Sequence, residues 1–310
     1  MREASRRPRR LKAGRPVLAG QDVAHNPLFA ERKLGLLRPF RVVRRAGGIV
    51  LLTLPCMLAQ TVFIVLPGRL KVTFAQLYWA MACRLLGVGV RVIGAPASAA
   101  GRPVIFVSNH SSWLDVPVLG GRIDACFVSK DEVGQWPIVG TVARLGRTIF
   151  VSRQRQATGR ERDMMRERLA AGDNLLLFPE GTTSDGSRVL PFRSSFFAIA
   201  EGPDAPLIQP ISVVYDRLSG LPTGRACRPV FAWYGDMDLA SHFWRFAQYK
   251  GLRVTVLLHA PIDPTRFASR KALSHAVWQA VADGASRLRQ NRPVAAEDPM
   301  AHGGAEPSYA

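Results

Sequence analysis

The chain has 310 residues, of which 47% are apolar and 21% charged, and this composition excludes a wholly disordered protein. Its 42 lysines and arginines against 23 acidic residues give a net charge of +19, which permits an anionic membrane surface or a nucleic acid as partner. The four cysteines are scattered and form no C-x-x-C pair, so the sequence predicts neither a disulfide framework nor a metal site of cysteines.

The first 45 residues carry much of the positive charge. They contain thirteen lysines or arginines and three acids, and show neither a helical nor an alternating apolar period. We therefore predict a flexible basic segment over residues 1–45. Nucleic-acid binding would need basic residues interleaved with aromatic ones on a folded face, and the basic run at residues 6–10 has no aromatic neighbour. The sequence thus predicts no nucleic-acid partner.

Two apolar segments follow. Residues 46–66 run for 21 residues without a charge, long enough to cross a bilayer. Residues 72–92 carry Arg84 near their middle, and basic residues flank both segments, so the positive-inside rule specifies no simple single crossing. We predict that residues 46–93 form a membrane-associated helical hairpin dipping into one leaflet, with both ends cytoplasmic. The alternative is that 46–66 spans the bilayer and 72–92 is a core helix.

Residues 94–290 have the pattern of an α/β domain. Short apolar, β-branched runs predict buried strands, and capped amphipathic stretches between or after them predict helices at 158–171 and 273–288. Strands separated by helices favour a mostly parallel sheet covered by helices on both faces. Residues 291–310 are predicted to be a disordered tail. The expected strands are 103–108, 125–129, 148–152, 175–178, 207–215 and 253–260.

Polar groups follow two of these strands, where chemistry gathers in such sheets. NHSSWLD, residues 109–115, follows strand 103–108, and Asp115 in the first turn of a helix can fold back onto one imidazole nitrogen of His110. This makes His110 a competent general base, whereas metal binding would need a third ligand. FPEGTTSDG, residues 178–186, follows strand 175–178 and suits a hydroxylated or anionic headgroup.

Together these groups resemble the glycerolipid acyltransferase family, the 1-acyl-glycerol-3-phosphate acyltransferases and their relatives. NHSSWLD matches the family's N-H-x-x-x-x-D block and FPEGTTSDG its F-P-E-G-T block. Between them lies a block that ends at Arg153, and PLIQPISVV resembles a later proline-bracketed strand. The resemblance covers about residues 100–215, with four blocks in order. It implies a glycerol-3-phosphate acyltransferase-like fold and an O-acyltransferase, a membrane enzyme of phospholipid biosynthesis.

The resemblance also assigns roles to individual residues. It makes His110 the general base and Asp115 its orienting partner, and it implies no metal and no cofactor. The acyl donor is a co-substrate, acyl-CoA or an acyl-carrier protein, and the active site lies on the cytoplasmic face of the membrane. Arg153 is implied to pair with the anionic group of the acceptor. Lys130 either assists Arg153 or is a solvated surface lysine. Residues implied to line the acceptor pocket are Glu180, Gly181 and Thr182.

The acceptor is a lyso-lipid, and 1-acyl-glycerol-3-phosphate, which would give phosphatidic acid, is placed first. Thr183 stands where phosphatidate-forming members usually have arginine, and the proline bracket Pro206 to Pro210 is one residue longer than usual. Both departures resemble relatives that acylate lyso-ornithine lipid or another lysophospholipid. A different class of function is a catalytically inactive, membrane-anchored lipid-binding protein, but His110, Asp115 and Glu180 are all present.

Overall fold

The computed structural model describes residues 37–98, 102–151, 158–202 and 205–294. The predicted basic segment up to residue 36 and the predicted tail from residue 295 lie outside the described residues, as does Arg153.

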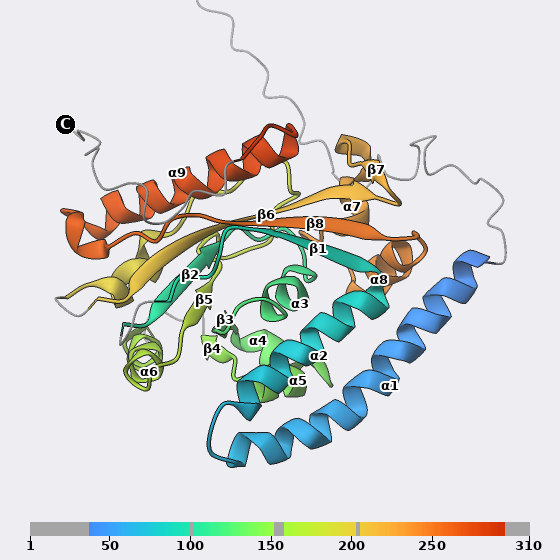
Figure 1. The fold of residues 1–310 in the computed structure, drawn as a ribbon, viewed down its shortest axis with the longest axis horizontal. Helices are drawn as coiled ribbons and strands as arrows, with labels where there is room; N and C mark the ends of the chain where they lie inside the picture. Colours follow the sequence, from blue (N-terminus) through green and yellow to red (C-terminus); the bar gives the residue numbers. More distant parts are fainter. Residues whose placement is uncertain (1–36, 99–101, 152–157, 203–204, 295–310) are drawn as a thin grey trace, which may run out of the picture. The chain divides into compact units, whose positions relative to one another are not determined.

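The centre of the fold is an eight-stranded sheet in the order β1-β8-β6-β2-β5-β3-β4, with β7 paired to β6 (Figure 1). Pairs along β6-β2-β5-β3-β4 are parallel, whereas β8 runs antiparallel to β6 and parallel to β1. The predicted mostly parallel sheet is therefore confirmed. The strands are β1 (Val88–Ile93), β2 (Val104–Ser108), β3 (Cys126–Lys130), β4 (Ile149–Val151), β5 (Leu175–Leu177), β6 (Leu207–Leu218), β7 (Leu221–Pro222) and β8 (Leu252–Leu258).

Helices cover both faces of the sheet. Met165 and Leu169 from one helix, and Leu273 and Val277 from another, pack with Ile105 on one face. On the other face α2 packs against α3, and α1 lies beyond α2 (Figure 1). The helices are α1 (Leu37–Val65), α2 (Leu70–Leu86), α3 (Asp115–Gly120), α4 (Asp131–Gly134), α5 (Val139–Leu145), α6 (Thr158–Ala170), α7 (Arg228–Phe231), α8 (Leu239–Ala247) and α9 (Arg270–Arg289).

The central strands β2 and β5 form where the sequence predicts them because, apart from Ser108, their side chains are apolar. All five residues of β2 and all three of β5 are buried, as expected for central strands of a parallel sheet. The strands predicted at 125–129, 148–152 and 253–260 correspond to β3, β4 and β8, and the predicted final helix corresponds to α9.

The predicted hairpin differs from the structure at both ends. Helix α1 begins at Leu37 rather than Ala46, so the end of the segment predicted to be flexible is helical. The reason is long-range, because Arg45 turns inward and binds backbone carbonyls at the end of α8 and just after it. Helix α2 ends at Leu86, and Gly87 follows it in the left-handed conformation, at φ 75°. Residues 88–93, predicted partly as helix, instead form β1 and pair with β8.

Candidate active site

The candidate site lies at the edge where three neighbouring parallel strands end. Strand β2 pairs with β5 on one side and with β6 on the other. His110 follows β2, and Glu180 follows β5. The two polar blocks of the sequence therefore meet because their strands are adjacent, as predicted for the carboxyl ends of parallel strands.

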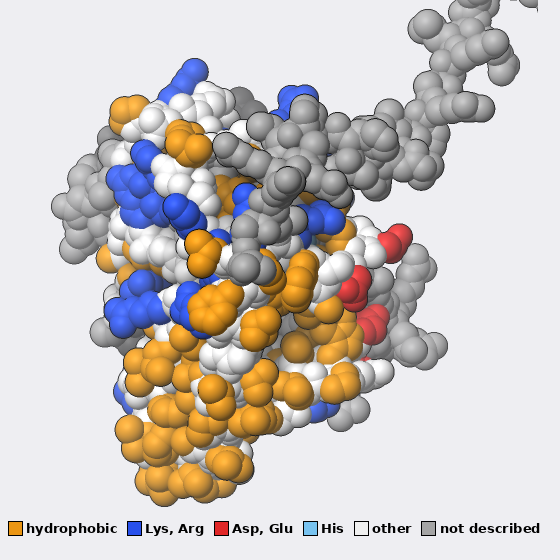
Figure 2. Space-filling view, turned by 90° about the vertical axis from the view of Figure 1, so that its right-hand side faces the viewer, with side chains coloured by type: hydrophobic (Ala, Val, Ile, Leu, Met, Phe, Trp, Pro, Cys, Tyr) orange, Lys and Arg blue, Asp and Glu red, His pale blue; other side chains and the backbone are white. Residues whose placement is uncertain are grey.

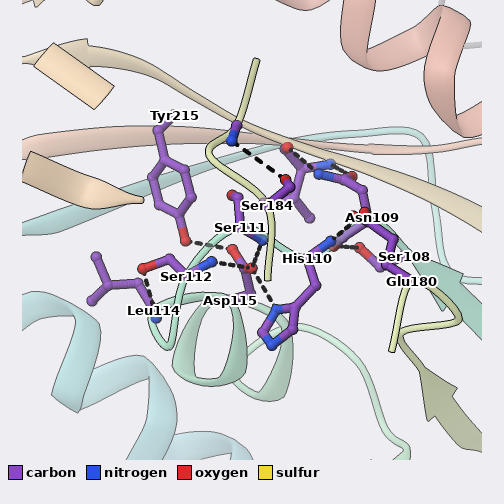
Figure 3. A network of polar contacts seen from close by, with 12 residues as sticks. Ser108, Asn109, His110, Ser111, Ser112, Leu114, Asp115, Glu180, Ser184 and Tyr215 are labelled. Atoms are coloured by element: carbon purple, nitrogen blue, oxygen red, sulfur yellow. Dashed lines mark hydrogen bonds and ion pairs between the residues drawn. The ribbon is translucent and has the colours of Figure 1, made fainter. Parts of the chain in front are cut away.

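His110 and Asp115 form a hydrogen-bonded pair, with 2.8 Å between His110 Nδ1 and Asp115 Oδ2 (Figure 3). Asp115 is fully buried and begins α3, so the carboxylate reaches back to the imidazole within one turn. The His110 side chain is 19% exposed, and no hydrogen bond from the described residues reaches its Nε2. The arrangement leaves Nε2 as the nitrogen able to meet a substrate.

Three further donors hold the Asp115 carboxylate. The backbone amides of Ser111 and Ser112 donate to Oδ2 at 2.8 and 2.9 Å, and the Tyr215 hydroxyl donates to Oδ1 (Figure 3). Burial and the neighbouring Asp115 charge raise the pKa of Tyr215 well above its ordinary value, so the phenol keeps its proton. With four partners the carboxylate has one orientation, and it fixes the imidazole in turn.

Glu180 supports the backbone of His110 rather than its ring. Glu180 Oε1 accepts from the His110 amide at 2.9 Å, and Oε2 accepts from the Leu190 amide at 3.3 Å. Burial raises the pKa of Glu180 to about 8, against the opposing effect of these two hydrogen bonds, and the nearby Asp115 charge raises it further. The carboxyl group is therefore mostly protonated at neutral pH.

The loop that carries His110 is fastened on both sides. Asn109 exchanges two hydrogen bonds with the backbone of Val213 in β6, at 2.8 and 3.0 Å. The Ser184 amide donates to the His110 carbonyl at 2.9 Å, and the imidazole stacks on Phe178 with 4.1 Å between ring centroids. These contacts fix the loop against β5 and β6, which limits the motion of the imidazole.

His110 and Asp115 thus form an imidazole–carboxylate pair at the carboxyl ends of neighbouring parallel strands. Comparisons with known proteins identify the family. A model of the family described as "Acyltransferase" matches residues 89–214. A lyso-ornithine lipid O-acyltransferase of Brucella abortus is 36% identical over 78% of this chain and 91% of its own length. The chain belongs to the acyltransferase family. It is an acyltransferase of the lyso-lipid type.

Other relatives of this acyltransferase include a lyso-ornithine lipid O-acyltransferase of Rhizobium meliloti, 39% identical over 71% of this chain and 77% of the relative. A 1-acyl-sn-glycerol-3-phosphate acyltransferase of Neisseria gonorrhoeae is 30% identical over 64% of this chain and 77% of the relative. The crystal structure of a 1-acyl-sn-glycerophosphate acyltransferase from Thermotoga maritima has a TM-score of 0.56 at 21% identity, covering 82% of this chain and 96% of that one. This likeness supports the fold.

The remaining predicted site residues of the acyltransferase are partly brought together. Gly181 has a φ of 67°, and the Arg193 guanidinium packs where a side chain at this position would lie. Thr182 is exposed. Lys130 ends β3, beside β5 and at the same edge of the sheet. Arg153 lies outside the described residues. Within the described ranges, no group of three or more His, Cys, Asp or Glu side chains could hold a metal ion.

Sequence reasoning missed Tyr215 as part of the site. The predicted strand 207–215 ends at this residue, at the edge where the other polar groups lie, which is a usable signal. The hydroxyl's direction toward Asp115 depends on the register between β6 and β2, which pairs Ser108 with Ile211. No local pattern specifies that register.

Helix α1 buries several polar side chains and exposes many apolar ones. Thr53 and Gln60 are buried, and they bind the Tyr78 hydroxyl and the Lys71 and Leu145 carbonyls respectively. Figure 2 shows apolar side chains gathered over one part of the surface. Among the described helices, α1 is long and apolar enough to cross a bilayer by length and composition. Its large apolar residues that are more than half exposed are Leu37, Phe40, Val43, Val50, Leu51, Leu54, Leu58, Val62 and Val65.

Proposed function

We propose that this acyltransferase moves a fatty acyl chain from a thioester donor to the hydroxyl group of lyso-ornithine lipid. The observation that carries the proposal is the similarity to relatives of that name, at 34–39% identity in four bacteria. Thr183 supports it, since the sequence lacks an arginine there to pair with a phosphate monoester. The order of the two acceptors is thus the reverse of the one expected from the sequence alone.

The second candidate acceptor is 1-acyl-glycerol-3-phosphate. It is favoured by the 30% identity to the two Neisseria 1-acyl-sn-glycerol-3-phosphate acyltransferases, which the chain covers over 77% of their length. The two acceptors share a free hydroxyl and an anionic group, so the same catalytic residues serve either. They differ in headgroup charge, which is the property the experiment uses.

The chemical step uses His110 as general base. Nε2 takes the proton of the acceptor hydroxyl as its oxygen attacks the thioester carbonyl, and an oxyanion forms. When the oxyanion collapses, the carbon–sulfur bond breaks, and the imidazolium returns the proton to the leaving thiolate. Asp115 holds Nδ1 at 2.8 Å and stabilises the imidazolium between these events. No covalent enzyme intermediate is needed, since the thioester is already activated.

The loop after β5 supplies the acceptor pocket in this proposal. Glu180, Gly181 and Thr182 line it, and Arg153 with Lys130 pairs with the anionic group of the headgroup. Glu180, protonated at neutral pH because burial raises its pKa to about 8, adds no negative charge to that pocket. A neutral carboxyl group there leaves the attraction between the basic residues and the headgroup unopposed.

The outward apolar face of α1 places the enzyme at its lipid substrate. A lyso-lipid lies in the bilayer whereas the acyl donor, acyl-CoA or an acyl-carrier protein, is water-soluble, so the active site belongs at the cytoplasmic surface of the membrane. Burial of the exposed leucines in the lipid interface, together with the positive charge of the chain, holds it there. This proposal includes no cofactor and no nucleic-acid partner.

The test is a transfer assay with the full chain in anionic vesicles, a labelled acyl donor, and lyso-ornithine lipid or lysophosphatidate as acceptor. We expect faster acylation of lyso-ornithine lipid and loss of all transfer in His110→Ala. His275→Ala, a change at an exposed histidine on α9, is the matched control and should keep full activity. Transfer by a folded His110→Ala protein would contradict the mechanism, and exclusive use of lysophosphatidate would contradict the acceptor.

Thr183→Arg sharpens the choice of acceptor. The added cation should raise the rate on the dianionic lysophosphatidate relative to zwitterionic lyso-ornithine lipid, since the attraction grows with headgroup charge. Thr183 lies between Glu180 and Ser184, which both bind the backbone of His110, so the change falls beside the base. An unchanged ratio of the two rates in an active protein would show that position 183 does not meet the headgroup.

A further inference from the structure

An arginine-rich cavity of about 160 Å³ lies beside the active-site loop. Asn109 and Ser111, the two chain neighbours of His110, are among its lining residues, and so is Tyr215. The mechanism above makes no use of it. Its charged lining residues are Arg188, Arg217, Arg228, Arg253, Arg289 and Asp216.

The positive charge of the cavity is only partly compensated. Arg253 forks onto the Asp216 carboxylate, with two Nε contacts of 3.0 Å, and this pair is neutral overall. Neither Arg188 nor Arg228 has an acidic side chain within 4.0 Å in the described part of the chain. Among the described residues, the hydrogen-bond partner of half-buried Arg289 is the Gly186 carbonyl, at 3.5 Å.

The arginine side chains of the cavity repel one another. Burial lowers the pKa of Arg289, and the charge of Arg228 lowers it further, while Asp185 opposes the shift. Asp185 itself is occupied by the amide and hydroxyl of Ser187 at 2.8 and 2.6 Å. Like charges held together at a cost to stability are typical of a site that an anionic ligand completes.

We propose that this cavity binds the phosphate of the phosphopantetheine arm of the acyl donor, an inference that rests on the proposed function. Guanidinium groups recognise phosphate by charge-assisted, bidentate hydrogen bonds. One water molecule needs roughly 10–15 Å³ of such space, so the cavity has room for the oxygens of a phosphate group and not for a whole lipid. The thioester end of the arm then extends past Ser111 toward His110.

The position of the cavity favours the donor over the acceptor. It is built by the end of β6, by β7 and α7, and by the end of α9. Figure 1 shows α9 on the face of the sheet away from α1, and β7 at the end of β6. The lipid acceptor reaches the enzyme from the apolar face of α1, so a charged site on the other side suits the water-soluble substrate. The donor and the acceptor thus approach His110 from different sides.

The first experiment varies the donor. Kinetics are measured with acyl-CoA, acyl-phosphopantetheine and acyl-pantetheine, of which the last has no phosphate. In Arg228→Ala and Arg289→Ala we expect KM for the two phosphate-bearing donors to rise about tenfold or more. A rise of this size corresponds to the loss of one charge-assisted hydrogen bond. KM for acyl-pantetheine and for the acceptor should not change. Arg287→Ala, an exposed arginine on the same helix outside the cavity, is the matched control.

The outcomes separate the alternatives. Equal losses on all three donors, or a change confined to the KM of the lyso-lipid, would overturn the assignment of the cavity to the donor. Arg228→Lys keeps the charge but not the bidentate fork, and it should recover part of the lost affinity. If Arg228→Ala fails to fold, Arg289→Ala and Arg228→Lys carry the same test.

The second experiment measures binding without turnover, so that it does not depend on the proposed reaction. Titration calorimetry on the His110→Ala protein compares 3′,5′-adenosine diphosphate, acyl-CoA and acyl-carrier protein, with and without Arg228→Ala. Arg228-dependent binding of acyl-CoA or acyl-carrier protein supports the site and identifies the carrier of the phosphate. Arg228-independent binding of both donors overturns it, whereas bound donor with no transfer by the wild type would overturn only the proposed function.

Discussion

The active-site loop and helix α1 both bury polar groups, yet they leave opposite kinds of surface exposed. In the loop, Asp115 is fully buried with four partners, and what remains open is one nitrogen of His110. In α1, Thr53 and Gln60 are buried with partners, and what remains open is a row of leucines and valines. Hydrogen bonds of buried polar groups orient a reactive atom in the first case and an apolar face in the second.

This difference indicates that the active-site residues and the apolar face of α1 are held in place by separate sets of contacts. The bonds that hold Asp115 come from residues 111, 112 and 215, none of which is on α1. Those that hold α1 reach α2, α5 and the residues after α8. Changes in one region should therefore leave the other intact, and the predictions below test that separation.

The largest effect is expected for Asp115→Asn. The amide cannot stabilise the imidazolium and favours the wrong tautomer, so kcat should fall by on the order of 10²- to 10⁴-fold. Binding to anionic vesicles should not change. The measurement pairs initial rates with vesicle co-sedimentation, and Asp283→Asn, at an exposed position on α9, is the control. A kcat near that of the wild type would remove Asp115 from the mechanism.

Glu180→Gln should change how stability depends on pH. The pKa of Glu180 is raised from about 4.5 in the unfolded chain to about 8 in the folded protein, so the folded state binds the proton more tightly. The free energy of unfolding of the wild type therefore falls as the pH rises through this window. Between pH 5 and pH 7 the free energy of unfolding of the wild type should fall by about 2 kcal/mol relative to that of the glutamine variant. Urea unfolding at several pH values measures this, and parallel curves for the two proteins would contradict it.

The double change Leu51→Glu and Leu58→Glu should weaken attachment. Both side chains are about three quarters exposed on the outward face of α1, so acidic groups there would meet the apolar lipid interface. We expect roughly tenfold weaker binding to anionic vesicles, with activity on detergent-dispersed substrate kept. Leu221→Glu, at a 71% exposed leucine on β7, is the matched control. Unchanged vesicle binding would mean that this face does not contact lipid.

The smallest effect is expected for Tyr215→Phe, since it removes one of four partners of Asp115. We expect kcat to fall about three- to tenfold with KM unchanged, and the acid limb of the pH–rate profile to move to higher pH. The limb moves because a carboxylate that has lost a donor binds the imidazolium more strongly. Tyr249→Phe is the control, and a fall in kcat without movement of the limb would indicate a packing role for Tyr215.

Much of the fold was predictable from the sequence because it is local. Runs such as residues 104–108 and 175–177 have no polar side to expose, so they form buried strands wherever the chain places them. The pair of His110 and Asp115 was equally predictable, since five residues across a strand–helix turn bring the two side chains together. The apolar character of residues 46–66 is also a property of the sequence alone.

Only the tertiary structure decided the contacts between distant segments. Tyr215 meets Asp115 across 100 residues because of the register of β6 against β2. Arg45 extends α1 to Leu37 by binding carbonyls some two hundred residues away, and residues 88–93 become a strand because β8 offers a free edge. The arginines of the cavity come from segments between residues 188 and 289. Local patterns specify which face of an element is apolar, but the partner of that face depends on packing that no short window of sequence contains.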